Sequence, residues 1–197
     1  MNTSSSPTVV IVPGLRDHVA DHWQTLLAER LDDARIVPPL EHHKLDRAAR
    51  VAALDAVLAD TAGPVVLVAH SAGVVTTVHW AQNSTRPIQG ALLATPADVE
   101  LPLPAGYPTT DELEHGGWTP IPRRTLPFPS IVAASRNDPL AGFRRVAGMA
   151  EAWGSRLVDL GDVGHLNPAA GYGFWSAAET LLQELIDDTS PVLSQAK

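Results

Sequence analysis

The segment PVVLVAHSAGVVTTVHW, residues 64–80, changes from a strand pattern to a helical pattern near its middle. Val65 to Ala69 is a short apolar run typical of a buried strand, and a helix is expected directly after Ser71. The turn between them nearly matches the G-x-S-x-G nucleophile elbow, with Gly73 as the second glycine and Ala69 in the place of the first. Taken alone, Ser71 could equally be the N-cap of the helix, so its role depends on what the rest of the chain places beside it.

The rest of the chain repeats this alternation of short strands and longer helices. The spacing of apolar residues favours helices around residues 19–31, at Arg47 to Ala59, after Ser71, from about Pro139 to Trp153 and around residues 174–185. Such alternation predicts an α/β fold, a mostly parallel sheet of about six strands with helices on both faces. The expected strands are Thr8 to Val12, Arg35 to Val37, Val65 to Ala69, Gly90 to Ala94, Ser130 to Ala134 and Arg156 to Leu160.

Length and composition indicate a single domain. A chain of 197 residues can bury a substantial core without disulfides or metals. We expect the domain to span residues 8–187, between a flexible N-terminus at 1–7 and a C-terminal tail at 188–197. The absence of cysteine excludes disulfides, a thiol nucleophile and thiolate metal sites. A formal net charge of -8 without a long basic run argues against nucleic acid as a partner.

The distribution of apolar residues also argues against a membrane partner. Apolar stretches are interrupted well before they could span a bilayer, and the first residues have neither the charge nor the apolar run of a signal sequence. A soluble, cytoplasmic protein is therefore expected. Its oligomeric state does not follow from the sequence.

Residues 96–129 break the alternation, because eight of the 17 prolines fall there. Proline holds a chain out of regular structure, and long loops in compact domains are often functional. We expect this excursion to form a wall of the substrate pocket that includes Trp118, in place of a separate cap domain. A surface insertion without function is the alternative.

Three candidate catalytic side chains each follow a different expected strand. Ser71 follows the third strand, Asp138 the fifth and His165 the sixth. Because ligands bind beyond the carboxyl ends of parallel strands, these side chains are expected to meet there. The chain order Ser, Asp, His is that of α/β-hydrolases. Asp159 or Asp162 is the alternative acid, and Asp138 could instead cap the following helix.

The stretches VVIVPGLRDHVADHWQ, AHSAG, SRNDPL and GHLN together resemble the small serine hydrolases typified by retinoblastoma-binding protein nine and the bacterial YdeN proteins. These proteins are a compact branch of the α/β-hydrolase fold. The resemblance extends over nearly the whole chain and implies Ser71, Asp138 and His165 as the catalytic triad. The Leu-x-Cys-x-Glu motif associated with retinoblastoma binding in one member is absent from a chain without cysteine.

Such a triad needs backbone donors for the oxyanion that develops on the substrate. We expect these donors to be the N–H groups of Ala72, directly after the nucleophile, and of Leu15, in the loop after the first strand. Gly14 would give that loop its flexibility. Ala69 is interpreted as a permitted substitution, because the elbow needs small residues on either side of the serine.

Further residues are candidates for the pocket or for other sites. His70 and Trp23 are expected to shape the substrate pocket with Gly14 and Trp118, although Trp23 also fits a helical core stripe. His18 and His22 have the spacing of a metal pair, but without further ligands a solvated helix start is the preferred interpretation. No metal or organic cofactor is expected.

The sequence thus predicts a serine hydrolase that cleaves small carboxylic esters, thioesters or amides through an acyl-enzyme. A catalytically idle binding protein of the same fold and an acyltransferase are the alternatives.

Overall fold

The fold is a six-stranded parallel sheet, seen in a computed structural model that describes residues 6–17 and 19–189. All neighbouring strands pair in parallel, in the order β2-β1-β3-β4-β5-β6. The strands are β1 (Thr8–Val12), β2 (Ala34–Ile36), β3 (Val65–His70), β4 (Gly90–Ala94), β5 (Ser130–Ala134) and β6 (Arg156–Asp159). The six predicted strands are confirmed, with ends that differ by one residue in three of them.

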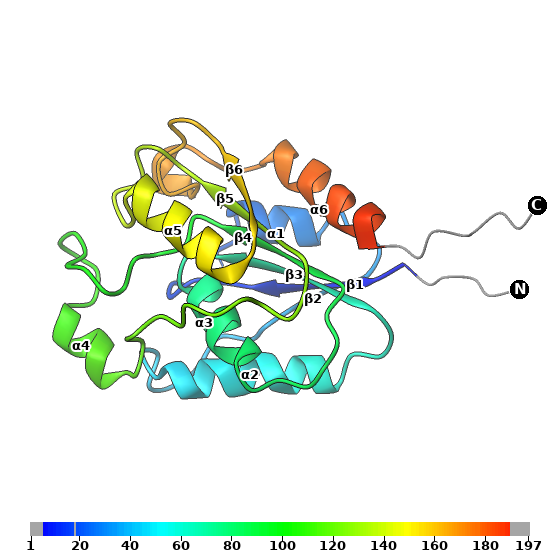
Figure 1. The fold of residues 1–197 in the computed structure, drawn as a ribbon, viewed down its shortest axis with the longest axis horizontal. Coiled ribbons are helices and arrows are strands. Elements are labelled where there is room, and N and C mark those ends of the chain that lie inside the picture. The colour runs from blue at the N-terminus through cyan, green and yellow to red at the C-terminus, as the bar shows by residue number, and fades with distance from the viewer. Residues whose placement is uncertain (1–5, 18, 190–197) are drawn as a thin grey trace, which may run out of the picture.

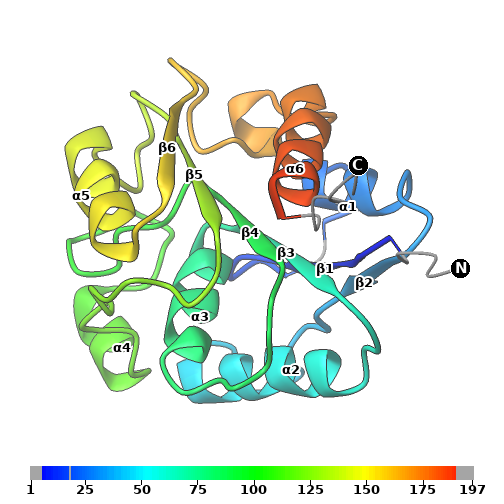
Figure 2. The same cartoon turned by 45° about the vertical axis from the view of Figure 1, so that its right-hand side comes forward.

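Helices cover both faces of this sheet (Figures 1 and 2). On one face lie α1 (Trp23–Ala28) and α6 (Ser176–Thr189), and on the other lie α2 (Arg47–Ala59), α3 (Ala72–Ala81) and α5 (Phe143–Trp153). Side chains alternate along each strand, so Val10 and Leu67 pack against the second group while Ile11 and Val66 pack against the first. The sheet is therefore buried on both sides, as its near-continuous apolar strands require.

Two of the expected helices begin later in the chain than predicted. Helix α1 covers only Trp23–Ala28, so Val19 and Leu31 of the predicted stripe lie outside it. Helix α5 begins at Phe143, four residues after the predicted start, because residues 138–142 make turns that present Asp138. At the C-terminal end, α6 continues to Thr189, beyond the domain end predicted at residue 187. Residues 1–5 and 190–197, which include most of the expected flexible termini, lie outside the described residues.

The excursion between β4 and β5 contains regular structure that its prolines do not predict. Helix α4 (Thr110–His115) begins with a capping box, in which Thr109 and Glu112 satisfy each other's backbone N–H groups. Upstream of α4, the buried Asp98 accepts hydrogen bonds from Arg145 of α5 at 2.7 and 3.0 Å. The excursion is thus anchored to α5 upstream of α4.

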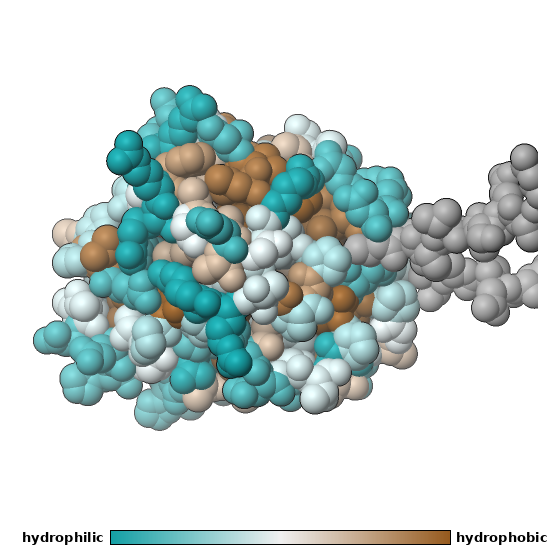
Figure 3. Space-filling view, in the orientation of Figure 1, coloured by the Kyte–Doolittle hydropathy of each residue, from teal (hydrophilic) through white to brown (hydrophobic). Residues whose placement is uncertain are grey.

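Charged residues border β6, the edge strand of the sheet. Hydrophobic side chains reach the surface over this strand (Figure 3), and Leu157 within it is 37% exposed. At its two ends, Arg156 pairs with Glu184 and Asp159 pairs with Arg136. Such charges disfavour pairing of the open edge with another strand. Within the described part of the chain, no helix is long and apolar enough to cross a membrane.

The strand order places the loops after β1 and β3 on either side of a crevice. The chain leaves β1 toward β2 on one side and later enters β3 on the other, so the direction of winding reverses between β1 and β3. Ligands of parallel α/β sheets bind at this kind of switch point, beyond the carboxyl ends of the strands. Gly14 and Ser71 lie at those ends.

Candidate active site

Ser71 lies on a strained turn between β3 and α3. Its backbone has φ 58° and ψ -125°, outside the regions that L-residues ordinarily adopt. The turn is held by the Ser71 N–H, which donates to the Ala94 carbonyl at 3.1 Å. Ser71 occupies the N-cap position of α3, but its side chain makes no capping hydrogen bond to the helix. Its hydroxyl is instead free to face the crevice.

The elbow requires small residues because β1 runs directly behind it. A Cβ added to Gly73 would lie 2.2 Å from the Val12 carbonyl oxygen and 2.7 Å from that of Pro13, both backbone atoms. Ala69, in the place of the first glycine, pairs with Val12 and Leu93 in the sheet and is fully buried. The tightest steric demand thus falls on Gly73, and the methyl group of Ala69 is accommodated in the core.

We predict that Gly73→Ala destabilises the protein by about 3 kcal/mol or more, because backbone carbonyls of a central strand cannot retreat from the new methyl group. The matched control is Gly148→Ala in α5, where a Cβ meets nothing within 4 Å. Alanine at this exposed helical position should stabilise by about 0.5–1 kcal/mol. Urea unfolding of both variants measures the difference. Equal stability of the two variants would contradict the close approach of α3 to β1.

His165 bridges Ser71 and Asp138. The Ser71 hydroxyl is 2.8 Å from His165 Nε2, and His165 Nδ1 is 3.0 and 2.9 Å from the two carboxylate oxygens of Asp138. Because a carboxylate only accepts, the imidazole proton is on Nδ1, and Nε2 is left to accept from the serine. The side chains of His165 and Asp138 are 5% and 2% exposed. The three residues that follow β3, β5 and β6 in the chain therefore meet in one buried array.

The other two candidate acids point elsewhere. Asp159 forms a bidentate pair with Arg136 on the surface and accepts from the Gly161 N–H. Among the described residues, Asp162 is exposed and forms no hydrogen bond or ion pair with His165. Asp138 also accepts from the Leu140 N–H at 2.8 Å, which fixes its own carboxylate in place. Geometry therefore distinguishes Asp138 from Asp159 and Asp162 as the partner of His165.

The loops that carry Asp138 and His165 are joined by side chain to backbone hydrogen bonds. The Gly164 N–H donates to Asn137 Oδ1 at 2.6 Å, and the Val163 N–H donates to Ser135 Oγ at 3.3 Å. The His165 carbonyl in turn accepts from His70 Nε2 at 2.9 Å. These bonds surround the imidazole with fixed backbone, so its orientation does not depend on Asp138 alone.

Two backbone N–H groups beside Ser71 have no acceptor within the described part of the chain. They belong to Ala72, at the first position of α3, and to Leu15, in the loop after β1. Both residues line the pocket that contains Ser71. Gly14 packs so closely that an added Cβ would lie 3.2 Å from the Ser71 Cβ. Unpaired donors next to a nucleophile can stabilise an oxyanion.

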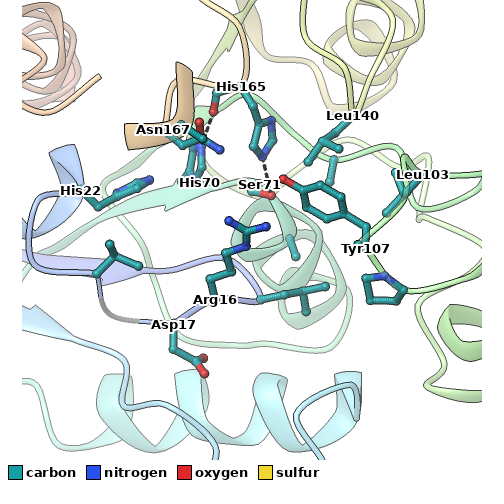
Figure 4. A pocket seen from close by; sticks show the side chains of 18 of the residues that line it. Arg16, Asp17, His22, His70, Ser71, Leu103, Tyr107, Leu140, His165 and Asn167 are labelled. Carbon is teal, nitrogen blue, oxygen red and sulfur yellow. Dashed lines mark hydrogen bonds between the residues drawn. The ribbon is translucent and has the colours of Figure 1, made fainter. Parts of the chain in front are cut away.

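A pocket of about 330 Å³ opens above Ser71 (Figure 4). Residues 97–108 of the excursion form one wall, as predicted, and the loop after β1 forms the opposite wall. Apart from Ser71 and His165, the pocket is lined by Gly14, Leu15, Arg16, Asp17, Val19, His22, Gln24, Leu45, His70, Ala72, Ala97, Val99, Leu103, Gly106, Tyr107, Pro108, Leu140, Asn167, Pro168 and Ala169.

Two tryptophans expected in the pocket lie in the core instead. Trp118 is fully buried, and its indole N–H donates to the Leu45 carbonyl at 2.7 Å, because the chain folds back after α4. Trp23 is 1% exposed and packs edge-on against Trp175 and His70. The prediction that these side chains line the pocket is wrong. Trp23 supports His70 from behind, while Gly14 and His70 do line the pocket.

His22 and His70 extend from His165 as a row of neighbouring, mutually tilted rings. Ring centroids are 4.9 Å apart between His165 and His70 and 4.6 Å between His70 and His22. Burial, reinforced by the charge that His165 would carry, lowers the pKa of His22 to about 4 and places the pKa of His70 well below its usual value. His22 is also the N-cap of α1, with Nδ1 accepting from the Gln24 N–H. His22 therefore lies at a helix start, as predicted, but its ring is half-buried beside the pocket instead of fully solvated. His18 lies outside the described residues.

These shifts predict a loss of stability in mild acid. The unfolded chain protonates His22 near pH 6.5, whereas the folded chain does so only near pH 4. Unfolding therefore takes up a proton in this window, and the free energy of unfolding falls as pH drops from 6.5 to 4, by up to about 1.4 kcal/mol per pH unit. His22→Asn, which keeps an N-cap acceptor, should flatten this slope.

Urea unfolding at several pH values would test this expectation, with His42→Asn as the control because His42 is an exposed histidine. A slope equally steep in His22→Asn and in the wild type would contradict it.

None of the described residues form a cluster of three or more His, Cys, Asp or Glu side chains suited to a metal ion.

Sequence reasoning missed several residues that the pocket brings together. Leu140 and Asn167 line it from positions two residues beyond Asp138 and His165, so they could have been found by reading those loops further. Tyr107 is an aromatic residue among the prolines of the excursion, a weak signal. Nothing in the local pattern distinguishes Arg16 from a surface arginine.

The parallel sheet, the serine on its strand-to-helix turn and the neighbouring histidine define the α/β-hydrolase class. The chain belongs to the serine hydrolase family, whose model matches residues 9–184, and it is therefore a hydrolase. Its structure is similar to that of a YdeN-like hydrolase from Pectobacterium atrosepticum, with 33% identity, a TM-score of 0.78 and coverage of 93% of this chain and 92% of the other.

More distant structures show the same fold. The ydeN gene product of B. subtilis is 18% identical, with a TM-score of 0.74 and coverage of 92% of this chain and 99% of the other. Est1E from Butyrivibrio proteoclasticus is 12% identical, with a TM-score of 0.69 and coverage of 95% and 88%. A search of curated proteins found no match. The expected resemblance to YdeN-like serine hydrolases is confirmed.

Proposed function

We propose that this enzyme hydrolyses small carboxylic esters through an acyl-enzyme on Ser71. The observation that carries the proposal is the hydrogen-bonded array of Ser71, His165 and Asp138 at the base of the pocket. A serine hydroxyl is a weak nucleophile at neutral pH and needs an adjacent base. His165 Nε2, 2.8 Å from the Ser71 hydroxyl, would accept its proton, and Asp138 would hold the imidazole in the required tautomer and stabilise its cation.

The reaction would proceed in two acyl transfers. As Ser71 Oγ attacks the ester carbonyl carbon, its proton passes to His165 Nε2 and the carbonyl oxygen becomes an oxyanion. The N–H groups of Ala72 and Leu15 would bind this oxyanion. When the ester C–O bond breaks, His165 gives the proton to the departing alkoxide, which leaves as an alcohol. Water then attacks the acyl-enzyme with His165 as base, which releases the carboxylic acid and restores Ser71.

The dimensions of the site favour small substrates. Its volume of about 330 Å³ lies at the lower end of the range for small-molecule pockets. The excursion that forms one wall is held by the Asp98–Arg145 pair and contains a single six-residue helix, α4, in place of a cap domain. We propose esters instead of amides because the departure of an alcohol depends less on protonation by the general acid than the departure of an amine does.

A fluorophosphonate probe tests the proposal directly. The probe should label one serine of the wild-type enzyme, and peptide mapping should place the label on Ser71. A panel of short-chain p-nitrophenyl esters then defines the acyl group. Labelling of another residue, or a folded wild-type enzyme that neither reacts with the probe nor cleaves any ester of the panel, would contradict the proposal.

A further inference from the structure

We propose that Arg16 binds a carboxylate of the substrate, so that the preferred esters carry a negative charge close to the bond that is cleaved. This inference rests on the proposed ester hydrolysis and adds a substrate class to it. The alternative is that Arg16 is an ordinary surface arginine without a role in binding.

The position of Arg16 is the first support. It follows Leu15, whose free N–H is proposed to bind the oxyanion, and its side chain extends from the wall formed by the loop after β1, between His22 and Tyr107 (Figure 4). A substrate whose carbonyl oxygen lies at the Leu15 N–H therefore lies beside the Arg16 side chain. A charged group on such a small substrate would share the pocket with the guanidinium.

The charge balance of the pocket is the second support. Asp17 is the only carboxylate among the described lining residues, and its side chain is 7% exposed. It is already held by Arg50 at 3.0 Å and Lys44 at 3.6 Å, on the side away from the pocket centre (Figure 4). Arg16 itself makes no ion pair or hydrogen bond with the described part of the chain.

The remaining titratable groups facing the pocket do not offset this charge. His22 and His70 are kept neutral near pH 7 by burial, and His165 is engaged by Asp138. Among the described lining residues, Arg16 is therefore the one cation without a carboxylate partner, in a chain whose formal net charge is -8. A field of this sign attracts an anionic substrate and disfavours a cationic one.

The Tyr107 ring contacts the guanidinium of the exposed Arg16. The Arg16 Cζ lies 5.3 Å from the centroid of the Tyr107 ring, a cation–π contact between the two walls of the pocket. A ring face provides no conventional hydrogen-bond acceptor, so the five N–H donors of Arg16 stay available. A guanidinium with free donors matches the two oxygens of a carboxylate.

The experiment compares anionic esters with neutral esters of the same shape. Monomethyl succinate has a carboxylate on its acyl part that methyl levulinate lacks. Acetoxyacetate has a carboxylate on its alcohol part that acetoxyacetone lacks. The wild-type enzyme should prefer the anionic member of at least one pair in kcat/KM. Arg16→Gln should lower kcat/KM for that anionic ester about tenfold and change its neutral partner by less than about twofold. Added salt should weaken the wild-type preference.

Arg144→Gln is the matched control. Arg144 is an exposed arginine on α5 outside the pocket, so its replacement makes the same change in net charge and should leave both esters of a pair unaffected. The proposal would be overturned if Arg16→Gln lowered kcat/KM equally for the charged and neutral esters. It would also be overturned if the wild-type enzyme preferred the anionic ester in neither pair.

A binding measurement separates this inference from the proposed reaction. Succinate should raise the Tm of the wild type and not that of Arg16→Gln, and this readout needs no turnover. No shift, or an equal shift in both proteins, would count against Arg16 even if esters are cleaved. A wild-type enzyme that binds succinate through Arg16 but neither labels at Ser71 nor cleaves any ester would instead contradict the proposed hydrolysis.

Discussion

Ser71→Ala is expected to lower ester turnover by a factor on the order of 10³ or more, and His165→Ala by a similar factor. Ser71 Oγ and His165 Nε2 are 2.8 Å apart, so one group supplies the nucleophile and the other the base of a single step. Because they act as a unit, the double variant should be hardly worse than either single variant. Initial rates with a short-chain p-nitrophenyl ester measure the effect.

The fold should survive these changes, which keeps the result interpretable. Alanine at position 71 removes only a hydroxyl, and the turn retains the backbone hydrogen bond from the Ser71 position to the Ala94 carbonyl. Far-UV circular dichroism and Tm should therefore stay close to wild type in Ser71→Ala. A folded Ser71→Ala enzyme that keeps more than about a tenth of the activity would refute the proposed nucleophile, given the expected size of the loss.

Asp138→Asn is expected to reduce turnover by a factor on the order of 10³. An asparagine amide can donate to His165 Nδ1, which would move the imidazole proton to Nε2. The nitrogen that faces Ser71 would then be a donor and could not accept the serine proton. Asparagine retains an oxygen that can accept from the Leu140 N–H, so the loop itself should keep its conformation.

Asp162→Asn is the control for this variant, since Asp162 is an exposed aspartate on the loop that carries His165. We expect it to keep wild-type turnover, measured with the same ester. If Asp162→Asn is inactive while Asp138→Asn retains activity, the assignment of the acid is wrong, and the distances of 2.9 and 3.0 Å to His165 have no catalytic meaning.

The sheet could be predicted closely because each central strand is a compact apolar run. A strand covered on both faces, such as Val65–His70, needs nearly continuous apolar residues, which leaves a strong local signal. The helices were less well predicted at their ends. The apolar stripe from Val19 to Leu31 extends beyond α1, because residues outside a helix can also pack against the core.

The excursion at residues 96–129 shows what composition misses. Its prolines predict irregular structure, but the Thr109 and Glu112 capping box begins a helix between them. Trp118 was expected to line the pocket, yet its indole N–H finds an acceptor at Leu45, a residue distant in the chain, and the ring is buried. Burial of this kind depends on how the chain folds back, which local patterns do not encode.

The order of residues along the chain was sufficient to indicate the class of fold and the three side chains proposed for catalysis. Ser71, Asp138 and His165 each follow a strand, and parallel strands end at one edge of a sheet, so local pattern and topology together bring them close. The pocket depended on tertiary structure. Arg16 and His22 come from the loop between β1 and α1, and Tyr107 comes from the distant excursion. Only packing determines that they line one pocket with Ser71, how their charges are paired and which pKa values burial shifts.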